Sequence, residues 1–117
     1  MFEAAVEFIK NGQFQKAEEA LLNISHERPG DFDANHMLGV VYSELGKTEL
    51  AEKHFKLTSS IDPNHPPLYQ NWGLFLSKQR RFGEAIEKFD LAIRLAPNFP
   101  PVYSYRGNAL KELGRYR

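Results

Sequence analysis

The stretch DFDANHMLGVVYSELGKTELAEKHFKLTSSIDP, residues 31–63, has two segments with apolar residues at helical spacing on either side of a Gly-Lys turn. The same pattern returns 34 residues later, so that Gly39 is followed by Gly73 and Gly107. The same step separates three prolines, Pro29, Pro63 and Pro97. Two independent series with one period indicate an internal repeat. A repeat of about 20–50 residues predicts a stacked helical solenoid.

The pattern resembles the tetratricopeptide repeat, which combines a Leu-Gly pair, an aromatic residue, an alanine, a phenylalanine and a proline at fixed offsets. The copy that begins at Asp31 matches this pattern at Asn35, Leu38, Gly39, Tyr42, Ala51, Phe55 and Pro63. The next copy matches at Tyr69, Trp72, Gly73, Leu76, Ala85, Phe89, Ala92 and Pro97. The resemblance covers essentially the whole chain. It implies an all-α, right-handed superhelical solenoid of about 3.5 repeats and seven helices.

The repeat predicts one domain over residues 1–117, with repeats at about 1–31, 32–65 and 66–99 and a half repeat at 100–117. The apolar periodicity predicts helices over residues 1–11, 13–25, 32–45, 48–61, 66–78, 82–95 and 100–113. Asp31 and Thr48 stand where helix N-caps are expected. Prolines at 66 and 67 fit the first turn of a helix, where the missing N–H costs nothing.

Small residues at fixed positions are predicted to let the two helices of a repeat approach closely. These are Gly39, Gly73 and Gly107 on the first helix and Ala51 and Ala85 on the second. Large side chains are predicted to fill the remaining space, namely Tyr42, Phe55, Trp72 and Phe89. We interpret all of these residues as structural.

The composition excludes several classes of protein. Lys and Arg together number 15, as do Asp and Glu, so we expect no nucleic-acid partner. The absence of cysteine excludes disulfides and fits a reducing compartment, and we expect a cytoplasmic protein. No apolar run approaches the roughly 20 residues that cross a bilayer, so we expect no membrane segment. The first ten residues lack the basic start and cleavage site of a secretory signal.

The residues that carry chemistry in other proteins form no recognisable set in this sequence. The four histidines, His26, His36, His54 and His65, do not stand at the spacing of metal ligands. His54 is expected to face solvent. We expect no metal, no cofactor and no catalytic group. The basic run at residues 78–81 lies at a predicted turn, where a solvated surface is favoured over a site for an acidic partner.

The resemblance implies a ligand-binding concave wall made by the first helix of each repeat. Counted from the repeat glycine, its central residues are His36, Met37, Val40, Gln70, Asn71, Leu74, Tyr105 and Asn108. Aliphatic residues bordered by neutral hydrogen-bonding groups suit an extended peptide or an amphipathic helix. We therefore expect a protein–protein interaction scaffold. The alternative is that the aliphatic residues of this wall only support the helices.

Some members of the family hold a C-terminal carboxylate with Lys, Asn and Arg side chains. The corresponding positions here hold His36, Val40, Asn71, Pro101 and Tyr105, of which Asn71 alone matches. Because a carboxylate needs cationic donors, we do not expect this type of ligand.

The last copy contains only its first helix. Leu110, Leu113 and Tyr116 are therefore expected to form an uncapped apolar edge. We favour a fragment of a longer array. The alternative is a natural end that pairs with a second copy and gives a homo-oligomer. A further alternative, implied by the resemblance, is an accessory domain of a larger enzyme such as a glycosyltransferase.

Overall fold

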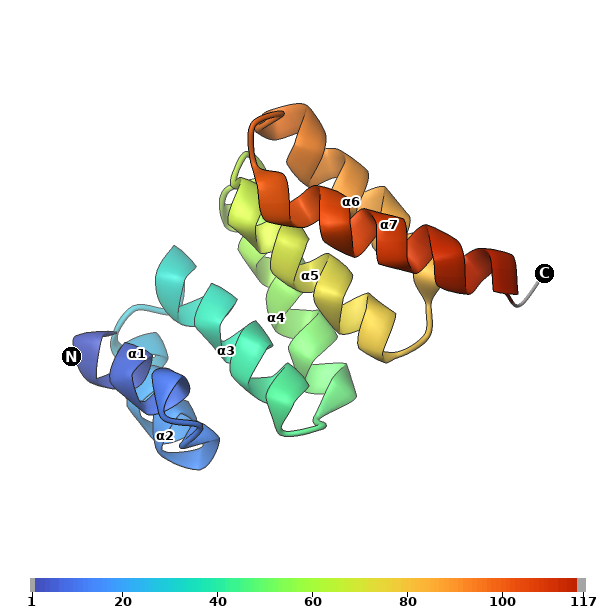
Figure 1. The fold of residues 1–117 in the computed structure, drawn as a ribbon. Helices are drawn as coiled ribbons and strands as arrows, with labels where there is room; N and C mark the ends of the chain where they lie inside the picture. The colour runs from blue at the N-terminus through green and yellow to red at the C-terminus, as the bar shows by residue number, and fades with distance from the viewer. Residues whose placement is uncertain (1, 116–117) are drawn as a thin grey trace. The chain divides into compact units, whose positions relative to one another are not determined.

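The computed structural model describes residues 2–115, which form seven α-helices and no strand (Figure 1). The helices are α1 (Phe2–Lys10), α2 (Phe14–Glu27), α3 (Phe32–Glu44), α4 (Thr48–Ile61), α5 (Pro66–Lys78), α6 (Phe82–Leu95) and α7 (Pro100–Arg115). The predicted all-α repeat fold is confirmed, and the predicted helices differ from the observed ones only at their ends. None of these helices is long and apolar enough to cross a membrane.

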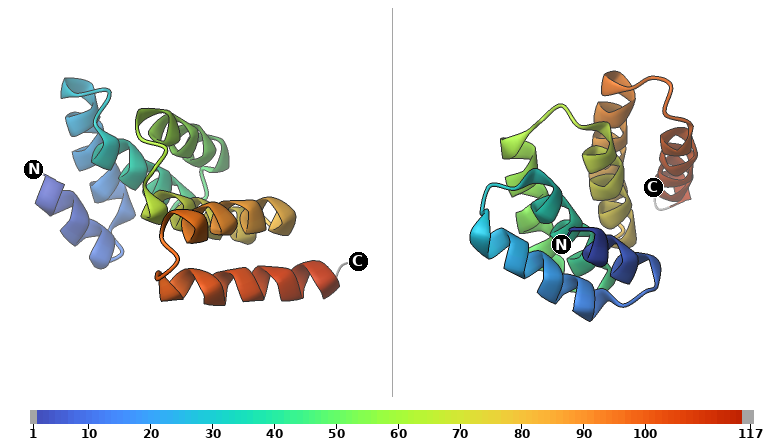
Figure 2. Two further views of the ribbon diagram at one scale, coloured as in Figure 1. Left: turned by 90° about the horizontal axis from the view of Figure 1, so that it is seen from above. Right: turned by 90° about the vertical axis from the view of Figure 1, so that its left-hand side faces the viewer.

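The chain divides into two compact units, Met1–Pro63 and Asn64–Arg117. In the first unit, α1 packs on α2, α2 on α3 and α3 on α4. In the second unit, α6 packs between α5 and α7, and α5 also touches α7. Figure 2 shows α7 running alongside α6 in both views. The prediction of one continuous domain with a right-handed superhelix stays a prediction.

The same hydrogen-bonded turn joins the two helices of each complete repeat. In each turn one N–H donates to the carbonyl five residues before it, from Gln13 to Phe8, from Lys47 to Tyr42 and from Arg81 to Leu76, at 2.8–2.9 Å. This is the Schellman arrangement, in which the residue directly before the donor takes a left-handed conformation. The residues in that conformation are Gly12 (φ 73°), Gly46 (φ 76°) and Arg80 (φ 61°).

Arg80 is therefore the exception among these turn residues. A left-handed conformation costs a residue with a side chain about 1–2 kcal/mol, because Cβ approaches the following carbonyl oxygen. Gly12 and Gly46 avoid that cost. The third turn has the same backbone geometry as the other two, but it has an arginine side chain at the position where they have glycine.

The predicted N-caps have different outcomes. Asp31 caps α3 as predicted, because its Oδ1 accepts a hydrogen bond of 2.9 Å from the Ala34 N–H. The prediction that Thr48 caps α4 is wrong, because Thr48 is already the first helical residue and Lys47 occupies the cap position. The Lys47 ammonium lies 3.4 Å from the Glu18 carboxylate and above the Tyr42 ring. Burial, followed by the hydrogen bond and charge of Glu18, raises the pKa of Tyr42 to about 12.

In the second and third repeats, the core contains a glycine on the first helix packed against a phenylalanine ring on the second, whereas the first repeat has the buried residues Ala5 and Leu21 at these two positions. A Cβ built on Gly39 would lie 2.8 Å from the ring of Phe55, and one built on Gly73 would lie closer still to Phe89. Both rings are fully buried. In contrast, a Cβ on Gly107 would meet nothing within 4 Å among residues 2–115. The three glycines were predicted to act alike, but Gly107 has no packing role in this structure.

This difference makes a testable prediction about stability. Gly73→Ala is expected to destabilise the protein by about 2–3 kcal/mol, because the buried Phe89 ring cannot move aside without strain. Gly107→Ala is the matched control. It is expected to be neutral or to stabilise by up to about 1 kcal/mol, because alanine favours the helix and meets no neighbour. Urea unfolding of both variants measures the effect, and equal destabilisation would contradict the packing argument.

Candidate functional site

The face of α3 predicted to bind ligand contains three residues that differ in exposure. Met37 and Val40 are half-buried. His36 is only 3% exposed, and its ring lies edge-on to that of Phe32, one helical turn earlier, with centroids 5.9 Å apart. His36 therefore packs within the fold. The prediction that it lines a ligand surface is corrected, because its imidazole has almost no accessible area.

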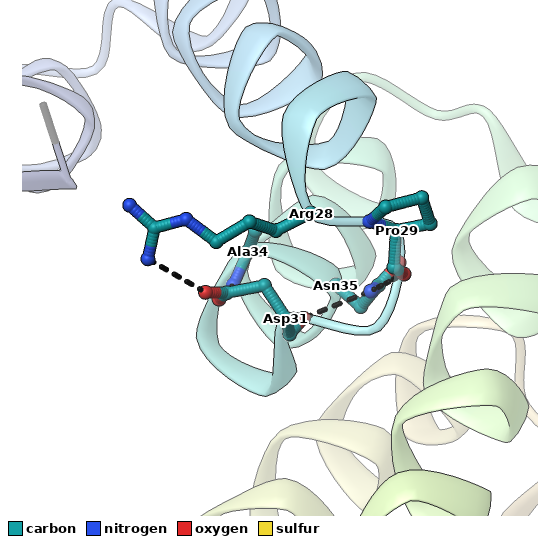
Figure 3. Close-up of polar contacts among 5 residues, drawn as sticks. All are labelled: Arg28, Pro29, Asp31, Ala34 and Asn35. Atoms are coloured by element: carbon teal, nitrogen blue, oxygen red, sulfur yellow. Dashed lines mark hydrogen bonds and ion pairs between the residues drawn. The ribbon is translucent and has the colours of Figure 1, made fainter.

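A buried amide on α3, that of Asn35, was predicted only as a repeat-pattern residue. Asn35 donates from Nδ2 to the carbonyl oxygens of Pro29 (3.0 Å) and Asp31 (2.8 Å). Figure 3 shows this amide inside the α2–α3 turn, where Arg28 also pairs with Asp31 at 3.8 Å. The two carbonyl acceptors identify which end of the amide carries nitrogen. The Oδ1 atom is consequently left as an acceptor.

His54 donates a hydrogen bond to the Asn35 Oδ1 atom. It is therefore not the solvent-facing residue that the sequence predicted. Its Nδ1 lies 3.1 Å from Asn35 Oδ1, so the imidazole donates from Nδ1. The ring packs against Tyr42 at a centroid distance of 5.5 Å. Burial, and then the positive charge of Lys53, lower the pKa of His54 below its ordinary value of 6.5. His54 is thus a neutral structural link between α4 and α3.

The corresponding face of α5 keeps its polar and aliphatic groups partly accessible. Gln70, Asn71 and Leu74 are each half-buried. The Oε1 atom of Gln70 is buried and has no hydrogen-bond partner among residues 2–115. A buried acceptor without a donor costs about 1–3 kcal/mol. Gln70 therefore loses no internal hydrogen bond to Oε1 if its side chain rotates toward a ligand.

The predicted residues of α7 lie in different surroundings. Tyr105 is half-buried, with its ring 6.2 Å from that of Phe89, so it packs on α6. Asn108 is exposed. Arg106, which the sequence did not single out, forms an ion pair of 2.6 Å with Asp90 and also joins α7 to α6. Tyr105 is accordingly committed in part to packing, whereas Asn108 is accessible.

The predicted apolar edge on α7 is split between two surfaces. Leu110 is 44% exposed, and Tyr103, which the sequence did not single out, is 49% exposed. Leu113 is half-buried in a groove against the α5–α6 turn. Tyr116 lies outside the described residues. The edge therefore consists of an open side near Leu110 and an enclosed side at Leu113.

Comparison with known protein families identifies the same repeat. Residues 8–71 match a family model described as tetratricopeptide repeat, and residues 66–99 match a second model with the same description. The chain belongs to the tetratricopeptide repeat family. As a tetratricopeptide repeat protein it is a general scaffold for protein interaction, with no partner specified by the family.

One curated relative of this tetratricopeptide repeat chain is Protein bimA of Emericella nidulans, which is 31% identical over 62 residues. Those residues make up 53% of this chain and 8% of bimA. The chain thus corresponds to a small part of the length of that relative.

Solved structures share the tetratricopeptide fold. A mutant Thermobaculum terrenum O-GlcNAc transferase has a TM-score of 0.88 at 24% identity, over 93% of this chain and 21% of that one. Pseudomonas aeruginosa pilF has a TM-score of 0.89 at 22% identity, over 97% and 52%. The first tetratricopeptide domain of Spaghetti (RPAP3), bound to an HSP90 peptide, has a TM-score of 0.88 at 17% identity, over 97% and 90%. At these identities the likeness establishes the fold alone.

The Asn35–His54 contact predicts a pH dependence of stability. Because the folded state lowers the pKa of His54, the unfolded chain binds a proton more readily. The stability that neutral His54 contributes is fully present above about pH 6.5 and is lost as the pH falls through the folded-state pKa. The free energy of unfolding in urea is therefore expected to decrease between about pH 7 and about pH 5.

His54→Gln is the matched variant, because glutamine keeps an N–H donor for Asn35 but does not titrate. The variant is expected to show a smaller decrease over the same pH range. Identical pH profiles for the two proteins would contradict the assigned role of His54.

Proposed function

We propose that this tetratricopeptide scaffold binds a short protein segment on the accessible face of its first helices, with α5 as the main contact. The observation that carries the proposal is the half-buried group Gln70, Asn71 and Leu74, in which the Gln70 Oε1 atom has no hydrogen-bond partner among the described residues. Asn108 on α7, which touches α5 within the same unit, adds an accessible amide. In the first unit, the half-buried aliphatic residues Met37 and Val40 of α3 offer a separate surface of the same kind.

The chemistry of these residues defines the ligand that suits them. Leu74 offers aliphatic contact, and the amides of Gln70, Asn71 and Asn108 both donate and accept hydrogen bonds. None of these groups is charged. The preferred ligand is therefore an extended peptide or an amphipathic helix with aliphatic anchors and uncharged polar groups. A terminal carboxylate fits poorly, because Asn71 alone matches the positions that hold one in other family members.

Gln70→Met tests this proposal with a variant that is expected to fold. Methionine has a similar size and removes the unpartnered acceptor, so stability is expected to stay equal or to rise. Peptides selected from a random display library on the native chain are expected to bind the variant about fivefold more weakly. Gln79→Met, at the exposed end of α5, is the control and should bind like the native chain.

Calorimetric titration gives the affinities, and NMR titration with the same peptides locates the contact. Shifts confined to α6, or equal affinities for Gln70→Met and the native chain, would contradict the proposal.

A second candidate function is self-association through the open side of α7. A Cβ added at Gly107 would meet nothing within 4 Å among residues 2–115, and Tyr103 and Leu110 are both exposed on this helix. Exposed apolar side chains of this kind mark interaction surfaces. We propose that two copies pair along this side of α7, which would make the chain a homo-oligomer.

Light scattering over a concentration series tests self-association. The native chain is expected to gain mass with concentration, and Leu110→Glu is expected to stay monomeric because the charge would be buried in the contact. Leu95→Glu, at a leucine of similar exposure on α6, is the control and should behave like the native chain. A monomer at all concentrations, or equal effects of both substitutions, would contradict this candidate.

The remaining proposals concern context. We propose a cytoplasmic setting because the sequence has no cysteine. A protein or peptide is the proposed partner, because the equal numbers of acidic and basic residues do not favour nucleic acid. An accessory role in a larger enzyme is a further proposal, supported by the tetratricopeptide fold shared with the O-GlcNAc transferase.

A further inference from the structure

A groove lies in the second unit between the α5–α6 turn and the end of α7. Its lining residues are Arg80, Arg81, Phe82, Gly83, Glu84 and Leu113, and its volume is about 480 Å³. This second-unit groove is large enough for a ligand, since small-ligand pockets in proteins span about 300–1,000 Å³. It is separate from the α5 residues of the proposed function.

The first unit contains the equivalent groove two repeats earlier. That first-unit groove is lined by Gly12, Gln13, Phe14, Gln15, Lys16 and Leu45, and its volume is about 330 Å³. Each lining residue corresponds in order to one in the second-unit groove, and a phenylalanine and a leucine recur in both. The apolar floor is therefore a product of the repeat. Any special property of the second-unit groove must come from the residues that differ.

The first difference makes the second-unit groove wider. Gly83 occupies the position that Gln15 holds in the first-unit groove. A Cβ built on Gly83 would meet nothing within 4 Å among residues 2–115, so there is open space at this point. A side chain introduced at Gly83 would project into that space without displacing a neighbour.

The second difference is the arrangement of charge. Arg80 and Arg81 replace Gly12 and Gln13, and Glu84 replaces Lys16, so both linings have a net formal charge of +1, but only the second-unit groove has two neighbouring guanidinium groups on its turn. Arg80 has a left-handed backbone conformation, and the two residues at the corresponding positions of the other turns, Gly12 and Gly46, are glycines. The guanidinium of Arg81 forms an ion pair with Glu84 at the same end of the groove. The turn therefore places a second cationic group, Arg80, beside the apolar floor in a backbone conformation that costs a residue with a side chain about 1–2 kcal/mol.

We propose that the second-unit groove binds an acidic protein segment that carries an aliphatic side chain next to its carboxylates. The aliphatic group would pack on Phe82 and Leu113, and a carboxylate would accept hydrogen bonds from Arg80 and Arg81, which favour carboxylates through their planar donor geometry. The complementarity to a carboxylate comes from this pair of arginines and not from the net charge of the chain, which has equal numbers of acidic and basic residues.

Fluorescence anisotropy with three labelled octapeptides tests the proposal. One alternates glutamate with leucine, one alternates lysine with leucine, and one alternates glutamate with serine. The native chain is expected to bind the glutamate–leucine peptide, and to bind the other two at least about tenfold more weakly. Added salt is expected to weaken the binding, because the arginine contacts are near the surface.

Two variants remove the two special features without a cost to folding. Arg80→Gly restores the residue that the other two turns carry, so its thermal midpoint is expected to equal or exceed that of the native chain. It is expected to bind the peptide about fivefold more weakly, the value of one lost surface ion pair. Gly83→Leu fills the groove and is expected to weaken binding roughly tenfold. Gln15→Leu, at the same position of the first-unit groove, is the control and should leave binding unchanged.

The outcomes separate this site from the face on α5. Loss of binding in Arg80→Gly and Gly83→Leu, with Gln70→Met unaffected, would support the groove. Binding that is lost in Gln70→Met but kept in the two groove variants would overturn it, as would equal affinity for the lysine peptide or no binding of the glutamate–leucine peptide.

Discussion

The contact between a glycine on one helix and a phenylalanine ring on the next sets the distance between the two helices in the second and third repeats. Gly39 and Gly73 have no room for even one methyl group beside the rings of Phe55 and Phe89. The rings are fully buried, so neither side of the contact can adjust. In each of these two repeats, one pair of residues therefore limits how far apart the two helices lie. The other packing positions, such as the buried Ala51 and Ala85, are compatible with that short distance.

Much of this fold could be predicted from the sequence because a period repeats the same physical requirement. The step from Gly39 to Gly73 identifies the helix pair, and the prolines and turn glycines mark the helix ends. Two details escape such reasoning. The left-handed conformation of Arg80 follows from the hydrogen bonds of the turn, which the repeat imposes whatever residue is present. The open surroundings of Gly107 are the other detail. The repeat pattern implies a phenylalanine ring beside each repeat glycine, as at Gly39 and Gly73, but the described residues place none beside Gly107.

The candidate site was predicted less well, because exposure of a helical side chain depends on its neighbours in space as well as on its position along the helix. His36 stands at a position assigned to the ligand face, yet it packs against Phe32 and is buried. His54 was expected to be solvated, but its partner Asn35 lies 19 residues earlier, and the contact between them is visible only in three dimensions.

Gln70, Asn71 and Leu74 remain partly accessible, so the α5 part of the predicted face is available for contact. The second-unit groove could not be read from the basic run alone, since Leu113 comes from a different helix.

The side chain of Asn35 has a consequence for how the first unit unfolds. It binds the turn that ends the first repeat, through Pro29 and Asp31, and it also binds His54 on the second helix of the next repeat. Unfolding in repeat proteins is commonly described as a row of elements, each with its own stability and a coupling energy to its neighbours. In that description one amide group supplies part of the coupling between adjacent repeats. Cooperativity between them would then depend on three hydrogen bonds as well as on the apolar area that the two repeats share.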